Sequence, residues 1–351
     1  MTENSHKGIA VKNIYYMLTY AFEILRERDY DALSTEEFVH IDDMMAAILI
    51  LGLSSQIKRG LNREYLIKDE ELTTLRGKIA LSATLKSQSH LKRSLFCQYD
   101  EFSEDNLMNQ IMKTAAWQLL RSPDVKLKKR RELKKLLGAF ANVQLLHNLK
   151  ISWNSLKFHR NNATCRMLMA ICQMIIERHL MSSVHGTTNL KNYEDDREMC
   201  RLYERFVLRY FQKHYPQYNA SSIHIKWNLD DEFMDFLPAM KTDITLKYGN
   251  KTLIIDTKWY SKTMQYHEQW HSMTCHSANL YQIFTYVKNH DRNRSGNVSG
   301  LLLYAKTDEV LTPNFDYRIG GNAISVKTLD LSGDWPAIDS QLKKIAACLE
   351  S

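Results

Sequence analysis

The sequence predicts a protein of mixed α+β or α/β class, with a helical N-terminal domain that contains a small β insertion and a C-terminal α/β sandwich. Apolar residues recur at helical spacing over residues 11–28 and 41–58, which predicts amphipathic helices. Beyond residue 223 the apolar period changes to two, and extended segments alternate with helices. The 351 residues are enough for two domains, which we expect at residues 1–160 and 161–351.

The N-terminal domain is expected to be helical except for residues 58–102, where β-branched and aromatic residues are separated by polar turns. Asp105 is expected to cap the helix that follows this β insertion. The expected elements are helices at residues 11–28, 41–58 and 105–120 and strands at residues 63–67, 75–80 and 95–99.

The C-terminal domain is expected to place a sheet after two amphipathic helices. Tyr248-Gly249-Asn250 is typical of a tight turn and predicts a hairpin between two strands. The expected elements are helices at residues 163–181, 195–215, 277–289 and 336–350 and strands at residues 223–227, 240–246, 253–258, 300–304 and 323–329.

Composition indicates a soluble protein of the cytoplasm. The first ten residues are polar, and the longest apolar run, Met44–Leu53, is about half as long as a membrane-spanning helix. The six cysteines form no CxxC pair, which fits a reducing compartment. No GxxxxGK[ST] motif is present, so we expect this chain to bind no nucleotide by itself.

The formal net charge is +7, and much of it lies in the block Lys126–Arg131, followed by Lys134 and Lys135. Such a block is typical either of a surface that contacts phosphate groups or of a solvated helix face. The sequence leaves both interpretations open.

Three residues form the chemically informative set of the chain: Asp243, Asp256 and Lys258. Side chains alternate along a strand, so Asp256 and Lys258 share one face of the apolar segment 253–258. Asp243 lies one hairpin upstream, where it can approach Asp256. This spacing matches the D…(D/E)xK signature of metal-dependent nucleases; a charged hairpin in which Asp256 and Lys258 simply pair is the structural alternative.

The chemistry explains these residue types. Hydrolysis of a phosphodiester requires a hard cation to neutralise charge on the phosphate, and carboxylates bind such cations. Asp243 and Asp256 can share the ion, and the Thr257 carbonyl can supply a further oxygen. Lys258 can orient the attacking water, or help to deprotonate it if its pKa is lowered.

Further residues are candidates for accessory roles. Gln282 and Tyr286 lie four apart on the following helix and therefore share a face. Glu204, on the helix before the sheet, can supply an extra acid. It also stands in a row of arginines at positions 197, 201, 205 and 209, and a surface ion pair with Arg201 is the simpler explanation. The arginines face either DNA or water.

A rival motif is His267-Glu268-Gln269-Trp270-His271, which matches the HExxH helix of zinc metalloproteases. Its flanks lack the amphipathic helix that the motif requires, and no clear third ligand follows. A zinc protease is therefore only a remote alternative.

At these residues the chain resembles the McrC family, the nuclease subunits of McrBC modification-dependent (5-methylcytosine) restriction systems. The resemblance covers nearly the whole length. It rests on the NIYYMLTYA string, on Lys58–Leu61 and Arg76–Ile79, and on the late strand Ser299–Tyr304, besides the nuclease signature. It implies a PD-(D/E)xK restriction-endonuclease-like fold for residues 161–351, with Mg²⁺ (one or two ions) as cofactor. In the PD-(D/E)xK motif a proline directly precedes the first aspartate. This chain departs from that pattern, because Pro238 lies five residues before Asp243.

The resemblance also implies a subunit that acts in an antiviral restriction complex. The implied partners are a McrB-like AAA+ GTPase hexamer, whose GTP hydrolysis the chain stimulates, and double-stranded DNA with modified cytosine. Self-association of the nuclease domain stays open. A non-catalytic assembly and GTPase-activating subunit with a decayed nuclease fold is the alternative.

Residues 1–160 are then expected to dock on the partner, with the β insertion as the contact. A folded spacer with an ordinary charged surface is the alternative. The candidates for partner contact and GTPase stimulation are Arg59, Arg63, Arg76 and Lys78.

Overall fold

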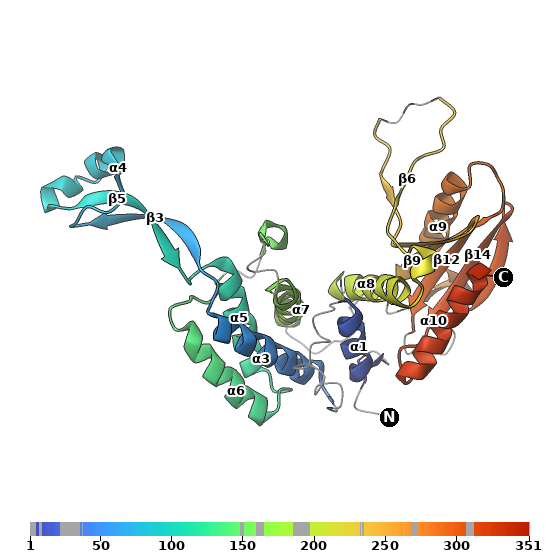
Figure 1. Ribbon diagram of the computed structural model, residues 1–351, viewed down its shortest axis with the longest axis horizontal. Coiled ribbons are helices and arrows are strands. Elements are labelled where there is room, and N and C mark those ends of the chain that lie inside the picture. The colour runs from blue at the N-terminus through green and yellow to red at the C-terminus, as the bar shows by residue number, and fades with distance from the viewer. Residues whose placement is uncertain are drawn as a thin grey trace. The chain divides into compact units, whose positions relative to one another are not determined.

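The computed structural model describes residues 5–6, 9–21, 36, 38–147, 151–158, 165–184, 197–231, 233, 235–260, 262–267, 272–306 and 312–350. The chain divides into two compact units (Figure 1). Unit 1 combines residues 1–41 with 187–351, and unit 2 contains residues 42–186. Unit 2 is therefore inserted between the first helix and the C-terminal half. The compact units do not coincide with the expected division at residue 160; the functional division into docking and nuclease domains stays a prediction.

Helices α3, α5, α6 and α7 form the body of unit 2, close to where the sequence predicts helices except for α6, which the basic block occupies. Their bounds are Ile41–Arg59, Leu107–Arg121, Leu127–Leu137 and Cys165–Val184. Asn106, rather than Asp105, caps α5, because its side chain accepts a hydrogen bond from the Asn109 amide. A Cβ at Gly52 would lie 2.1 Å from Leu168 Cδ2, so a glycine is needed where α3 meets α7. Short 3₁₀ turns are η3 (Ser89–Lys92), η4 (Gly138–Phe140) and η5 (Trp153–Ser155).

The expected β insertion is confirmed as a small sheet that extends from the helices of unit 2 (Figure 1). Within the described residues its strand order is β3-β5-β4, and β3 and β5 pair antiparallel over their whole length, from Glu64↔Ser103 to Leu72↔Leu95. We call residues 64–103 the β arm. Its elements are β3 (Glu64–Leu72), β4 (Lys78–Ile79), α4 (Leu81–Lys86), η3 and β5 (Leu95–Ser103).

Unit 1 is built on a mixed sheet, whose strand order among the described residues is β13-β14-β12-β9-β8. The central strands β9, β12 and β14 are parallel, and both outer strands are antiparallel to their neighbours. Gly249 and Asn250 join β8 to β9, which confirms the predicted hairpin. The bounds are β8 Ile244–Tyr248, β9 Lys251–Lys258, β12 Val298–Ala305, β13 Phe315–Ile319 and β14 Asn322–Leu329.

Helix α9 (Ser277–His290) connects β9 to β12 and packs on both strands. Their contact is close at Gly300, where an added Cβ would lie 2.7 Å from Ile283 Cγ1 and 2.9 Å from Val287 Cγ2 of the helix. Gly300 therefore sets the distance between α9 and the sheet. Helices α8 (Arg197–His214) and α10 (Trp335–Glu350) also contact the sheet, at β8 and β9.

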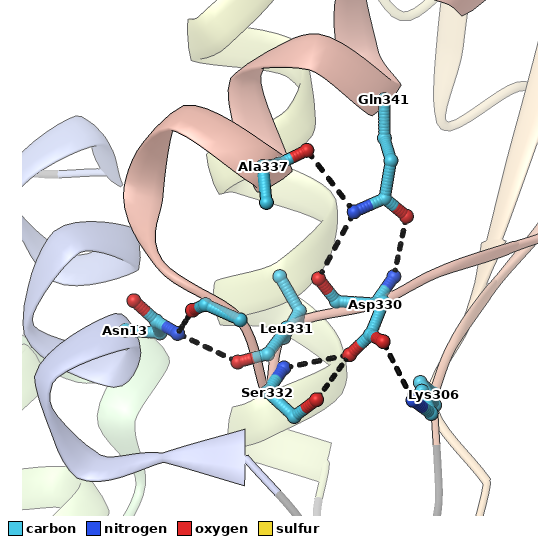
Figure 2. Close-up of polar contacts among 8 residues, drawn as sticks. Asn13, Lys306, Asp330, Leu331, Ser332, Ala337 and Gln341 are labelled. Carbon is cyan, nitrogen blue, oxygen red and sulfur yellow. Dashed lines mark hydrogen bonds and ion pairs between the residues drawn. The ribbon is translucent and has the colours of Figure 1, made fainter.

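The N-terminal helix α1 (Val11–Ala21) belongs to unit 1 and packs against α8. Its Tyr20 ring stacks on Trp335, with 5.1 Å between ring centroids. Asn13 Nδ2 donates hydrogen bonds to the carbonyls of Leu331 (2.7 Å) and Gly333 (2.6 Å), in the loop before α10 (Figure 2). The NIYYMLTYA string thus completes the core of the unit that contains the C-terminal half.

Short elements complete unit 1. They are β1 (Ser5–His6), β2 (Ile9–Ala10), η6 (Pro216–Tyr218), β6 (His224–Ile225), β7 (Met240–Lys241), β10 (Met264–His267) and β11 (Ser272–Cys275). Among the described residues of both units, no helix combines the length and the apolar character that a membrane crossing requires.

Candidate active site at the end of strand β9

The hairpin β8–β9 brings the two predicted acids together. Ile244 pairs with Ile255, which places Asp243, one residue before β8, beside the end of β9. Asp243 Oδ2 accepts hydrogen bonds from the Thr257 amide and from Thr257 Oγ1, both at 2.8 Å. Thr257 therefore fixes the Asp243 carboxylate through its amide and its hydroxyl.

Asp256 is the buried acid of the pair, with a side chain that is 1% exposed. Lys258 Nζ lies 2.6 Å from Asp256 Oδ2, so the two residues form an ion pair. Lys258 is therefore the counter-ion of this buried oxygen, and the pairing that the structural alternative predicts is present. Burial and the charge of Asp243 raise the pKa of Asp256 to about 6, although Lys258 acts in the opposite direction.

Lys258 is held as an ammonium ion. Burial lowers its pKa, but Asp256, together with the charges of Tyr260 and Asp243, outweighs burial, so the pKa of Lys258 lies above its ordinary value. The lowered pKa that proton abstraction by Lys258 would require is therefore not observed. As the site stands, Lys258 can donate hydrogen bonds and stabilise negative charge.

Helix α9 supplies the partners of Lys258 that the sequence suggested. Lys258 Nζ donates to Gln282 Oε1 at 3.0 Å, and Gln282 Nε2 donates to the Tyr286 hydroxyl, also at 3.0 Å. Asn279, one turn earlier, donates to the buried Tyr304 hydroxyl at 2.8 Å. The structure thus links Asp256, Lys258, Gln282 and Tyr286 in one polar chain.

Glu204 on α8 also faces the site. Burial, then the charges of Asp243 and Asp256, raise its pKa to about 7, while Lys241 and Arg201 act to lower it. Arg201 acts on Glu204, but burial and the two other carboxylates outweigh it; the role of Glu204 in the site stays a prediction. The sequence did not lead us to expect Lys241 as a charged neighbour of the site. Its position two residues before Asp243 could have indicated this, because alternate residues of an extended segment share a face.

The candidates for GTPase stimulation lie in unit 2 and do not form one cluster. Arg59 ends α3 and is exposed. Arg63 pairs with Glu104 at 2.5 Å. Arg76 stacks over the Tyr99 ring at 4.0 Å from its centroid, and with Lys78 it lines a pocket of about 600 Å³ on the β arm.

Gly77, between these two cations, adopts a φ of +69°, and a Cβ there would lie 2.3 Å from the Gln98 carbonyl oxygen. The Arg76–Ile79 element therefore needs its glycine for backbone conformation as well as for space.

The rival zinc motif is not helical where it begins. His267 ends β10 and pairs with Ser272 across the β10–β11 hairpin, whereas a zinc protease needs both histidines on one helix. Glu268–His271 lie outside the described residues. Among those that are described, no group of three or more His, Cys, Asp or Glu side chains is arranged to hold a metal ion.

The basic block has a mixed role. Lys129 Nζ is buried and contacts Asp43 Oδ2 at 2.9 Å, and Arg130 donates to the carbonyls of Val125 and Pro123. These cations stabilise unit 2, whereas other basic side chains of the block stay exposed, including Lys128 and Lys135. Neither interpretation of the block holds for all of its residues.

Comparison with known proteins identifies relatives over nearly the whole chain. The model of the family described as McrBC 5-methylcytosine restriction system component matches residues 2–305. A protein of Escherichia coli strain K12, the type IV methyl-directed restriction enzyme EcoKMcrBC, is 26% identical over 341 residues, which are 96% of this chain and 97% of that protein.

Solved structures from Thermococcus gammatolerans are similar in fold. One is a half-complex from a tetradecameric assembly of McrB AAA+ hexamers with bound McrC; the similarity covers 97% of this chain and 76% of that chain, with a TM-score of 0.50 and 18% identity. The other, an McrBC complex, matches 57% of each chain at 21% identity and a TM-score of 0.41. Since the family match extends over most of the sequence and agrees with the motifs quoted above, this chain belongs to the McrBC 5-methylcytosine restriction system component family.

Proposed function

We propose that this chain is the DNA-cleaving subunit of a restriction complex and that its carboxylates act with a divalent metal ion. The observation that carries the proposal is the pair of carboxylates at the end of β9: Asp256 is 1% exposed, lies beside Asp243, and has Lys258 Nζ at 2.6 Å from its Oδ2 as counter-ion. One lysine does not balance two neighbouring carboxylates, and buried carboxylate charge is costly unless a further cation offsets it. The raised pKa of Asp256 expresses the same cost.

The donor set fits a hard cation. The charge of Asp243 helps to raise the pKa of Asp256, and a divalent ion between these two carboxylates would remove the repulsion. Oxygen donors of this kind suit Mg²⁺, and the Thr257 carbonyl can add another. We propose Mg²⁺, as one or two ions, held by these residues. When bound, the ion would stabilise negative charge on the scissile phosphate.

The chain's own residues supply the remaining requirements. Lys258 keeps its proton at neutral pH, so it can donate to a phosphate oxygen or orient a water molecule. Gln282 and Tyr286 restrict the side chain of Lys258 through the hydrogen bonds described above. Such restriction places the ammonium group before substrate arrives.

The test is Asp256→Asn in the full chain, assembled with its GTPase partner. We expect DNA cleavage and Mg²⁺ binding to be lost, while partner binding and stimulation of GTP hydrolysis remain. Asp316→Asn is the matched control, because it also removes a lysine-paired carboxylate, but on the exposed surface of β13. Cleavage by Asp256→Asn at the normal rate would refute the site. A subunit with a decayed nuclease fold predicts instead that the unsubstituted chain neither binds Mg²⁺ nor cuts DNA.

We further propose that the chain acts with an AAA+ GTPase and binds it through the β arm. One structure similar in fold, from Thermococcus gammatolerans, holds McrC bound to McrB AAA+ hexamers. Large apolar side chains are exposed on the arm, as expected of a binding surface. They are Tyr65 (72%), Ile67 (69%), Leu75 (59%), Leu81 (65%), Leu85 (63%), Leu91 (71%) and Phe102 (53%).

The arm can be removed with little disturbance to unit 2. Glu64 and Ser103 pair across the sheet, so an Asn-Gly turn can join them in place of residues 65–102. Asn62 must be kept, because its carbonyl accepts hydrogen bonds from Asn106 and Asn109 at the start of α5. We expect this variant to fold, to retain Mg²⁺ binding, and to lose partner binding and GTPase stimulation. Normal stimulation by the armless chain would refute the docking role.

A further inference from the structure

We infer that the outer face of helix α8 is a track for the DNA backbone that leads to the Asp243–Asp256 site. This inference rests on the proposed nuclease function and adds to it the surface by which the substrate is held. The face forms a groove of about 380 Å³, which we call the α8 groove. It is lined by Arg201, Glu204, Arg205, Leu208, Arg209 and Gln212.

The groove exists because α8 is amphipathic with a wide apolar side. One side of α8 is buried and carries Tyr203, Phe206, Val207 and Tyr210. The residues that line the groove recur every three or four positions on the opposite side and face outward. Three of these are arginines at intervals of four, and a rise of about 1.5 Å per residue spaces them by about 6 Å along the helix. The groove therefore presents an ordered row of cations.

One arginine is held in position before any ligand arrives. Arg209 Nη1 donates to Gln212 Oε1 at 3.0 Å, and Gln212 Nε2 donates to the Ala220 carbonyl at 2.9 Å. A guanidinium fixed in this way loses less conformational entropy when it binds an anion. Arginine also matches phosphate oxygens in a planar, two-point geometry.

Charge complementarity selects a polyanion as the occupant. Among the residues that line the groove, three are arginines and one, Glu204, is a carboxylate. Glu204 lies close enough to Asp243 and Asp256 to feel their charges, and α8 packs on β8 and β9, which lead to the active site. A nucleic-acid strand that follows the groove therefore arrives at the carboxylates. Backbone contacts of this kind position a strand without reading its sequence.

The test measures binding of the full chain to a fluorescently labelled DNA duplex by anisotropy, without divalent metal and across a salt series. In the variant Arg205→Gln/Arg209→Gln we expect the Kd at low salt to increase about tenfold or more. The slope of log K against log salt should fall in magnitude by about 1.8, since each phosphate contact contributes about 0.9. Lys247→Gln/Lys344→Gln is the control, because both lysines are exposed on unit 1 away from the groove and the charge change is the same.

Three results would overturn the inference. The first is a Kd and salt slope of the arginine variant equal to those of the control. The second is no binding of DNA by the unsubstituted chain at low salt. The third is a change of molar mass of the arginine variant in light scattering with an unchanged Kd, which would assign the groove to a second copy of this chain. Failure of the proposed nuclease function would appear elsewhere, as cleavage by Asp256→Asn, whereas the anisotropy of the arginine variant would still decide the role of the groove.

Discussion

Replacing Asn13 by alanine tests how firmly the N-terminal helix α1 is attached to the rest of unit 1. The Asn13 side chain is 3% exposed and donates to two carbonyls that lie 318 and 320 residues away. Alanine leaves both acceptors without this donor. Helix α1 would then lose its polar attachment to the loop before α10 but keep its other contacts, which include the hydrogen bond between the Tyr20 hydroxyl and His214 Nε2 at 2.8 Å.

The size of the effect follows from the two hydrogen bonds. Each contributes about 1 kcal/mol net, and a buried acceptor left unsatisfied costs more. Leu331 is fully buried, but water can reach the partly buried Gly333 carbonyl, so we expect a total of about 2–3 kcal/mol. A loss of about 2 kcal/mol corresponds to a roughly 30-fold change in an opening equilibrium.

Hydrogen–deuterium exchange of the full chain measures this locally. We expect the amides of α1 and of the start of α10 to exchange roughly 30-fold faster in Asn13→Ala, with unit 2 unchanged. Lys12→Ala is the control, because Lys12 is exposed on the same helix. Asn13→Asp keeps the shape but replaces the donor by an acceptor, and we expect it to cost more than alanine. Unchanged protection of α1 in Asn13→Ala would show that the remaining contacts of α1 hold the helix without Asn13.

Three further predictions concern the sheet and the site. Gly300→Ala places a methyl group against Ile283 and Val287, so we expect the free energy of unfolding, measured with denaturant, to fall by about 1–3 kcal/mol. Gly333→Ala is the control and should cost less, because its Cβ meets only an ordinary 3.5 Å contact. Equal costs for the two variants would contradict this explanation. The pKa values of Asp256 and Glu204 are raised in the folded chain, so these groups bind protons more readily there than in the unfolded chain. Without metal, the stability of the fold should therefore fall as pH rises from about 4 to 7. Glu204→Gln removes one of the two groups and should flatten this dependence of Tm on pH. Lys258→Met removes the positive charge that lowers the pKa of Asp256, so Asp256 should lose its proton at a higher pH than in the unsubstituted chain. Because Mg²⁺ binds the deprotonated carboxylate, Mg²⁺ binding in calorimetry should also begin at a higher pH. An unchanged or lower onset would argue against the ion pair.

Local patterns predicted which polar side chains lie together at the end of β9. The alternation of residues 253–258 places Asp256 and Lys258 on one face, and the interval from Gln282 to Tyr286 places both on one face of α9. Both relations depend on one element and a short connection, so few alternatives exist. The hydrogen bonds from Lys258 to Gln282 and from Gln282 to Tyr286 confirm the placement. The catalytic roles of these residues stay predictions.

Long-range relations could not be obtained in this way. Arg201 lies close to Glu204 in the sequence, whereas the carboxylates that set the pKa of Glu204 belong to strands far along the chain. The apolar face of α1 shows that the helix is buried, but not which unit buries it. Strand β13 was missed because it is an outer strand and is mostly exposed, so its apolar alternation is weak.

The position of α1 also has a consequence for biosynthesis. Asn13 leaves the ribosome long before its acceptor Leu331, and 318 residues separate the two. At synthesis rates of about 5–20 residues per second, the loop before α10 that binds α1 is synthesised roughly 15–60 s after α1. Unit 2 is contiguous in sequence and can fold during this interval. A newly made chain can therefore display its folded β arm before the carboxylates at the end of β9 are brought together, so the proposed docking surface would form earlier than the proposed active site.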